Sequence, residues 1–334
     1  MGGSGRVVCV TLNAAIDRTY YHEDLRIGHI NRVQKVVSQA GGKGNNVARA
    51  IHRLGGCVTA TGFVAGQNGQ FIEVGLQKEG IATAFCTVPA GESRVCLTLV
   101  DAANHTATEF MEPGVAITMR DVEQLCQQLK GMVEPGSFVI FSGSLPPGCT
   151  ISAFAHLIEV TQRLGARVVV DTSGDALIHA ARCRPYAMKP NEHEVEALLA
   201  NASGAESELP ADRETKLRDM LVQLQQSGVA LPIVTLGSNG CIACDHDTIY
   251  RVHAPEVSVK NAVGSGDCFL GGVVYGLATG QSISSALAIG TAAGAVNATK
   301  ESAGMIQHEE VMHLAGQIQV TAEPWVQAHT SPRS

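Results

Sequence analysis

Two glycine-rich segments of the sequence each lead directly into a helix-like stretch. The first, Gly41-Gly42-Lys43-Gly44-Asn45-Asn46, fits neither the Walker A loop nor the dinucleotide fingerprint, whose third glycine is replaced by Val47. Backbone amides at a helix N-terminus beside a lysine suit a ligand rich in hydroxyl or phosphate oxygens. A tight strand-to-helix turn would explain one or two glycines, but not the lysine and both asparagines.

The second segment is Asn261-Ala262-Val263-Gly264-Ser265-Gly266-Asp267. Backbone amides from Gly264 to Asp267 would form an anion hole at the start of the following helix. An aspartate is poorly suited to phosphate binding unless it carries out proton chemistry. Asp267 is equally well explained as a helix N-cap, a position that favours aspartate. The segment by itself leaves both interpretations open.

Two further motifs follow strand-like residues. In Lys189-Pro190-Asn191-Glu192-His193-Glu194, Asn191 and Glu194 are three residues apart and share one face of a starting helix. Such a pair can hold hydrated Mg²⁺, although acidic residues in a first turn also stabilise helices. The segment from Thr235 to Gly240 (TLGSNG) is a strand entering a glycine turn, and by itself it fits any hairpin.

Other candidate metal or redox sites are better explained as structure. His308 and His313 are five residues apart, whereas the zinc-protease helix requires a spacing of four. Cys241 and Cys244 lie in a strand-like run with no second pair following. The 10 cysteines of this chain are therefore interpreted as small, reduced apolar residues.

Strand-like and helix-like segments alternate along most of the chain and must position these motifs. Strands are predicted at residues 6–12, 59–64, 137–141, 167–171 and 233–236, with helices between and after them. This alternation predicts an α/β fold with a mostly parallel central sheet flanked by helices. The 334 residues are assigned to a single domain, 1–334, with a loose C-terminal tail at 321–334.

Two stretches interrupt the alternation, at about 14–38 and 93–112. In the second, Val95, Leu97 and Leu99 alternate with Cys96, Thr98 and Val100, as in a strand of a two-faced sheet. Both stretches predict paired antiparallel strands. They would form a small flap over the carboxyl edge of the main sheet, where open α/β sheets bind ligands.

Composition excludes several classes of protein. The chain is 45% hydrophobic and 16% charged, with a net charge of −7, so it is globular and has no overall electrostatic reason to bind nucleic acid or an anionic membrane. Its first residues lack the charged and apolar regions of a signal peptide, and we find no apolar run long enough for a membrane span. A cytoplasmic location is predicted.

Taken in order, the motifs resemble the signatures of the PfkB, or ribokinase-like, carbohydrate kinase family. The segments that carry the resemblance are TLNAAIDRTYY (Thr11–Tyr21), GGKGNNVARA, SGSLPPG (Ser142–Gly148), DTSGDAL (Asp171–Leu177), MKPNEHE, VTLGSNG and NAVGSGD. The resemblance covers about residues 6–315. Within the family, Lys43, Asn31-Arg32 and Arg94 are similar to the phosphosugar kinases, namely tagatose-6-phosphate kinase and 1-phosphofructokinase.

The resemblance implies a ribokinase-like fold and an ATP-dependent kinase that uses Mg²⁺. It implies that Asp267 takes a proton from the primary hydroxyl of the sugar while Gly264, Ser265 and Gly266 hold charge on the transferred phosphoryl group. The implied metal-binding residues are Asn191 and Glu194. The remaining implied positions are Lys189, Thr235, Gly237 and Gly240 for the nucleotide, Asp17, Gly41, Gly42 and Asn46 for sugar hydroxyls, and Arg32, Lys43 and Arg94 for the substrate phosphate.

The substrate expected from the resemblance is tagatose 6-phosphate or fructose 6-phosphate. After Arg94 the chain has Val95-Cys96-Leu97, where 1-phosphofructokinases usually have Ile-Asn-Val-Lys, and this favours the 6-phosphates. The alternatives are a 1-phosphofructokinase, a kinase of an unphosphorylated sugar or nucleoside, and a noncatalytic sugar-phosphate-binding regulator. A regulator would be expected to lose Asp267 or Glu194. The apolar flap strands predict a homodimer joined through the flaps.

Overall fold

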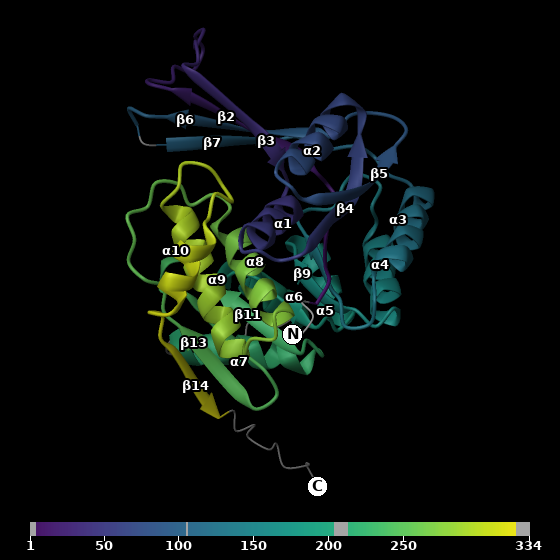
Figure 1. The fold of residues 1–334 in the computed structure, drawn as a ribbon, viewed down its shortest axis with the longest axis vertical. Helices are drawn as coiled ribbons and strands as arrows, with labels where there is room; N and C mark the ends of the chain where they lie inside the picture. Colours follow the sequence, from purple (N-terminus) through teal and green to yellow (C-terminus); the bar gives the residue numbers. More distant parts are fainter. Residues whose placement is uncertain (1–4, 105, 204–212, 325–334) are drawn as a thin grey trace.

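The computed structural model describes residues 5–104, 106–203 and 213–324 (Figure 1). Its larger sheet has the strand order β14-β13-β12-β11-β10-β9-β8-β1-β4-β5. Neighbouring strands are parallel from β11 to β5, and antiparallel from β11 to β14. The strands of this sheet are β1 (Val7–Thr11), β4 (Val58–Ala65), β5 (Ala82–Val88), β8 (Phe138–Ser142), β9 (Arg167–Asp171), β10 (Ala187–Met188), β11 (Leu231–Thr235), β12 (Cys241–Cys244), β13 (Thr248–Val252) and β14 (Val320–Pro324).

Helices cover both faces of this sheet. Every residue of β1 is buried, and its alternate side chains join two different cores, with Val8 and Val10 in one and Val7 and Cys9 in the other. The first core includes α3 (Met119–Met132), α4 (Ile151–Arg163), α5 (Gly174–Arg182), α6 (Glu192–Ser203) and α7 (Arg213–Gln226). The second includes α1 (Lys43–Arg53), α2 (Gly66–Lys78), α8 (Ser265–Ala278) and α9 (Ile283–Ala298), while α10 (His308–Ala315) packs on α9.

A second, four-stranded sheet forms the flap, in the order β3-β2-β6-β7. It consists of β2 (Ala15–His22), β3 (Lys35–Gly41), β6 (Arg94–Asp101) and β7 (Thr106–Met111). Figure 1 shows these strands extending from the β4–β5 side of the molecule to lie above α10 in this view. The predicted α/β fold, with a mostly parallel sheet and a small flap, is confirmed.

The C-terminal segment differs from its prediction. Residues 321–324 were expected to be part of a loose tail, but they belong to β14, which pairs with β13 from Val252↔Val320 to Thr248↔Pro324. The outer edge of β13 offers free backbone groups, and pairing satisfies them even though four of the five β14 residues are exposed. The polar composition that indicated a tail is compatible with an edge strand. Residues 325–334 lie outside the described residues.

Close packing of two helices fixes the position of α8. A Cβ on Gly272 would lie 2.8 Å from Cα of Gly290, and a Cβ on Gly290 would lie 2.4 Å from Cγ2 of Val273. The glycines therefore let α8 and α9 approach closely enough for backbone contact. Among the described residues, no helix is long and apolar enough to cross a membrane.

Candidate active site

A cavity of about 1290 Å³ lies between the flap and the carboxyl edge of the main sheet. The flap lines it with one face, because alternate residues such as Asp17, Thr19 and Tyr21 of β2 border the cavity. From the main body, the cavity is lined by the loops after β1, β8 and β9, by the starts of α1, α6 and α8, and by residues 301–303. The carboxyl edge is where parallel α/β sheets bind ligands.

Asp267 lies in the first turn of α8, at the wall of this cavity. Its residue exposure is 7%, and its Oδ2 accepts a hydrogen bond of 2.9 Å from Nδ2 of Asn46. Burial raises the pKa of Asp267 to about 7, with a further upward contribution from the Asp171 carboxylate and opposing contributions from Asn46, Lys43 and Lys189. The carboxyl can therefore accept a proton near neutral pH, as a general base must.

The predicted anion hole is smaller than the sequence indicated. Gly264 and Gly266 line the cavity, and Gly264 takes the left-handed conformation with φ of 77°. The Ser265 amide donates to the carbonyl of Ala262 at 3.1 Å, and Ser265 Oγ accepts a hydrogen bond from Asn297. Ser265 thus holds the loop, while first-turn amides such as those of Gly266 and Asp267 have no partner within the helix.

Asp171 is a second buried carboxylate in the cavity, and it was missed as a site residue. It ends β9, is 1% exposed and forms an ion pair of 3.1 Å with Lys189, while its Oδ2 accepts a hydrogen bond from Ser142 Oγ. Lys189 also lies beside Gly266, because a Cβ there would be 3.8 Å from Lys189 Nζ. The signal was the position of Asp171 at the carboxyl end of a predicted strand, within a segment quoted only for family resemblance.

Asp17 faces the first glycine loop. A Cβ on Gly41 would lie 2.1 Å from Cγ of Asp17, so only glycine permits this approach. Burial raises the pKa of Asp17, although the charge of Arg49, the backbone amide of Gly42 and the charge of Arg94 oppose this shift. Asp17, Gly42 and Asn46 border the cavity, whereas Gly41 packs against the Asp17 carboxyl and is not among the lining residues.

Asn191 and Glu194 form a reciprocal helix cap at the cavity wall. The backbone N–H of Asn191 donates to Glu194 Oε2 at 2.9 Å, and the backbone N–H of Glu194 donates to Asn191 Oδ1 at 2.8 Å. The cap uses one oxygen of each side chain, yet the Glu194 carboxylate and the Asn191 amide oxygen, which line the same cavity as Asp171, are the hard donors that suit a hydrated divalent metal. Thr235 lines the cavity next to Asn191, to which it is bridged. Gly237 begins the 3₁₀ turn that follows Thr235 and Gly240 ends it, and neither glycine is among the lining residues.

Two of the three predicted phosphate-binding cations, Arg94 and Lys43, line the cavity. Arg94 lines the cavity near Asp17, donating Nε to the Asn13 carbonyl and Nη1 to the Glu112 carbonyl. Lys43 lies near other carboxylates, because its pKa is raised first by Asp171 and, against the effect of burial, by Asp267 and Glu194. Arg32 is exposed in the long β2–β3 connection and does not line the cavity, because this connection extends away from the main body.

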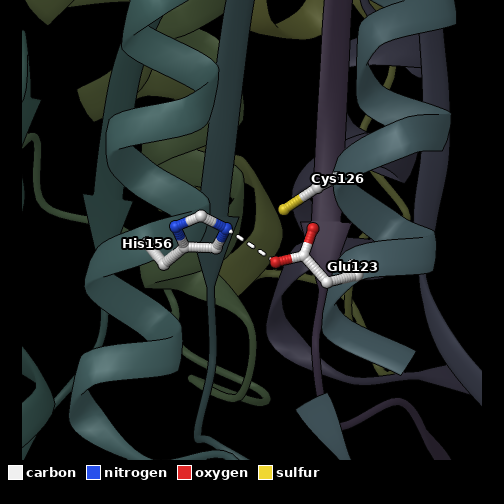
Figure 2. A group of neighbouring side chains, drawn as sticks. All are labelled: Glu123, Cys126 and His156. Atoms are coloured by element: carbon white, nitrogen blue, oxygen red, sulfur yellow. Dashed lines mark hydrogen bonds and ion pairs between the residues drawn. The ribbon is translucent and has the colours of Figure 1, made fainter. Parts of the chain in front are cut away.

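A further group of potential metal ligands lies outside the cavity, between α3 and α4. Figure 2 shows His156 pointing to Glu123, with Nε2 and Oε1 3.1 Å apart, and the Cys126 sulfur beside the carboxylate. Cys126 is 1% exposed, and burial raises the pKa of its thiol, which opposes the thiolate form that binds metals. The group is explained as a partly exposed hydrogen bond between His156 and Glu123, next to a buried thiol that packs as an apolar group.

A family model described as pfkB family carbohydrate kinase matches residues 5–309. The chain therefore belongs to this family, as its motifs indicated, and the family uses ATP and usually a divalent metal. The structure resembles phosphofructokinase-2 from Escherichia coli in complex with fructose-6-phosphate, with 28% identity, coverage of 94% of this chain and 99% of that chain, and a TM-score of 0.85.

Two other solved structures are similar over nearly the whole chain. A putative phosphofructokinase from Staphylococcus aureus has 30% identity, covers 95% of this chain and 99% of its own, and gives a TM-score of 0.79. A possible 1-phosphofructokinase from Thermotoga maritima has 24% identity, coverage of 96% and 100%, and a TM-score of 0.80. The second supports the fold alone.

We predict that Asp267→Asn removes a pH-dependent loss of stability. The folded protein releases the Asp267 proton near pH 7, whereas an unfolded chain releases it near pH 4, so this residue lowers the free energy of unfolding as pH rises from 4 to 7. The Asp267→Asn variant lacks this slope. Urea unfolding gives the free energy of unfolding of the variant relative to the wild type. This difference should be more favourable to the variant at pH 8 than at pH 5, by about 1 kcal/mol or more. An equal difference at both pH values would contradict the elevated pKa.

Proposed function

We propose that this kinase transfers the γ-phosphoryl group of ATP to a primary hydroxyl of a ketohexose monophosphate, tagatose 6-phosphate or fructose 6-phosphate. The observation that carries the proposal is a buried carboxyl, Asp267, with a pKa of about 7 at the wall of a large cavity between the flap and the N-terminus of α8. The likeness to an Escherichia coli enzyme in complex with fructose-6-phosphate supports this substrate class. The cytoplasmic location stays a prediction.

In the proposed reaction, the sugar oxygen forms a bond to the γ-phosphorus while the bond to the β,γ-bridging oxygen breaks, and ADP leaves. Asp267 accepts the hydroxyl proton. The first-turn amides of α8, with Lys189 and Lys43, stabilise charge on the transferred group, since phosphoryl transfer depends mainly on positioning and electrostatics. Asp17 and the Gly42 backbone orient the sugar hydroxyls.

Asn191 and Glu194 are proposed to hold Mg²⁺ through its water shell, with Asp171 close by. A bound Mg²⁺ would neutralise charge on the ATP phosphates. Thr235, Gly237 and Gly240 are proposed to border the nucleotide, with Gly237 and Gly240 shaping the turn. The carboxylates of Asp171 and Glu194 raise the pKa of Lys43. This supports a position of Lys43 between the sugar phosphate and ATP.

Two alternative kinases differ from the proposed one in their preferred substrate, and a third alternative has no catalytic activity. A 1-phosphofructokinase would prefer fructose 1-phosphate over both 6-phosphates, and a ribokinase-like enzyme would prefer a free sugar or nucleoside. A noncatalytic regulator would have no need of a buried base, whereas Asp267 and Glu194 both line the cavity. Steady-state kinetics with ATP and a panel of hexose phosphates and free sugars distinguishes these possibilities.

Asp267→Asn is expected to lower kcat by roughly 10²–10⁴, the range for loss of a general base, while ATP binding and the folded state are preserved. The measurement is steady-state kinetics on the preferred sugar phosphate, with ATP binding by calorimetry. Asp247→Asn, in the exposed β12–β13 turn, serves as a matched control. A loss of less than tenfold would remove Asp267 from the mechanism and leave it only its structural hydrogen bond to Asn46.

Arg94→Ala is expected to lower kcat/KM for the 6-phosphates by roughly 10- to 150-fold, because a charge-assisted hydrogen bond contributes about 1.5–3 kcal/mol. Activity on unphosphorylated fructose, where measurable, should change little. Arg163→Ala is the control, since Arg163 is an exposed residue of α4 that pairs with Glu159 and does not line the cavity. An equal effect of Arg94→Ala on both sugars would mean that Arg94 only anchors the flap.

We propose further that two copies associate through the outer faces of their flaps. Leu97 and Leu99 are half-buried on that face, beside Val36 and Phe110, which are 50% and 54% exposed. Val95, grouped with these leucines from the sequence, packs against the core instead. One solved form of the Escherichia coli enzyme is tetrameric, which supports association in the family.

Sedimentation at micromolar concentration should show a dimer for the wild type. Leu99→Lys should convert it to a monomer, because a charge would be buried in an apolar interface. Leu99→Met, which preserves apolar volume, should remain dimeric. A wild-type chain that sediments only as a monomer would contradict the flap dimer.

A further inference from the structure

Arg49 of α1 is a buried charged residue behind the active site. Its side chain is 2% exposed, and it forms a two-pronged ion pair with Glu79, from Nε to Oε2 at 2.6 Å and from Nη2 to Oε1 at 2.9 Å. Glu79 follows the end of α2, and its side chain is 27% exposed. Arg49 Nη2 also donates to the carbonyl of Ala40, at the end of β3. The guanidinium is therefore held between two helices and a flap strand.

The remaining contact of Arg49 is directed to the active site. Its Nη1 donates to Oδ1 of Asn46 at 2.8 Å, and Nδ2 of the same amide donates to Oδ2 of Asp267 at 2.9 Å. A guanidinium can only donate, so it binds the oxygen of the amide and turns the NH₂ group to the other side. A carboxylate can only accept, so this orientation suits ionised Asp267.

We propose that Arg49, anchored by Glu79, is a positioning residue for phosphoryl transfer, and that it orients the Asn46 amide so that Asn46 holds Oδ2 of Asp267. This inference rests on the proposed role of Asp267 as the base. Within the described ranges, Oδ2 is the oxygen of Asp267 with a side-chain hydrogen bond, so Oδ1 is the oxygen left to take the substrate proton. Arg49 touches no reacting atom.

Packing alone does not require this arrangement. Replacing a buried ion pair by apolar side chains of similar size is often neutral or stabilising. Arg49 also packs tightly, because a Cβ on Gly304 would lie 2.7 Å from its Cδ, next to the 301–303 wall of the cavity. A methionine could fill much of that volume. What an apolar side chain cannot supply is the donor that fixes the Asn46 amide.

The electrostatic consequence concerns the charged groups facing Asp267. These are Asp171 from β9, which raises the pKa of Asp267, and Lys43 from α1 and Lys189 after β10, which lower it. The hydrogen bond from Asn46 lowers the pKa as well. If Arg49 no longer fixes the amide, Asp267 loses this bond for part of the time, and its pKa rises.

The test uses Arg49→Met and the paired variant Arg49→Met/Glu79→Met, which leaves no unpaired charge if the single variant fails to fold. The Asp267 carboxyl is titrated by ¹³C NMR in full-length protein without substrates, and its resonance is assigned by its loss in Asp267→Asn. We expect its pKa to rise by about one unit in both variants, comparable to the loss of a charge-assisted hydrogen bond. Arg49→Lys should give a smaller rise. Arg53→Met, one turn further along α1, should give none.

Kinetics then link the titration to function. The acid limb of the kcat/KM profile should move up with the NMR value in Arg49→Met, and Asn46→Ala should produce a similar shift. Combining Asn46→Ala with Arg49→Met should add little, because both act through one amide. A purely structural Arg49 would lower Tm and leave both values in place, which would overturn the proposal.

The two readouts separate this inference from the proposed function. If Arg49→Met shifts the Asp267 titration but the wild type phosphorylates no sugar phosphate, the proposed substrate is wrong and the control of the Asp267 carboxyl holds. If the folded paired variant titrates like the wild type, Arg49 does not position Asp267. A shift in Asn46→Ala without one in either Arg49 variant likewise assigns the effect to Asn46 alone.

Discussion

The arrangement of the site depends on one desolvated carboxyl, Asp267, which must be ionised to accept a proton. Burial opposes ionisation, and the neighbouring Asp171 carboxylate adds to that opposition. The N-terminus of α8, two lysines and the Asn46 amide act in the other direction. A pKa of about 7 is the balance of these effects. Ionisation of buried Asp267 therefore lowers the free energy of unfolding above neutral pH, while the same residue can act as a base near pH 7.

The geometry around this carboxyl follows from helix placement and from the flap. The contact between Gly272 and Gly290 brings α8 and α9 together, so the first turn of α8 reaches the carboxyl edge of the sheet. The flap then covers that edge with one face of a two-faced sheet. Because its side chains alternate, polar residues such as Asp17 face the cavity while apolar ones such as Leu99 face outward. One strand pattern therefore serves both the site and the proposed association of two copies.

The sequence was sufficient to predict the fold class, the flap strands and the motifs whose residues border the cavity, because these depend on periodicity and on short spacings. It could not show that Ser265 would be occupied by loop contacts, since that depends on Asn297, 32 residues further along. Asp171 and Arg49 were missed for a similar reason. Their importance comes from partners on other elements, such as Lys189 and Glu79. Arg32 lies in a long connection between strands, where the sequence does not fix the position of a side chain, so its role in phosphate binding stays a prediction.

The groups that lower the pKa of Asp267 differ in how they respond to bound substrate. Lys189 is already paired with Asp171, and Lys43 is influenced by three carboxylates, so phosphates entering the cavity compete for both lysines. Competition of this kind weakens the support that each lysine gives to ionised Asp267. The Asn46 amide is neutral and has its oxygen bound to Arg49, so phosphates have much less effect on it. The hydrogen bond from Asn46, whose amide is held by Arg49, therefore favours ionised Asp267 to nearly the same extent as the site fills, whereas the contributions of the two lysines decrease.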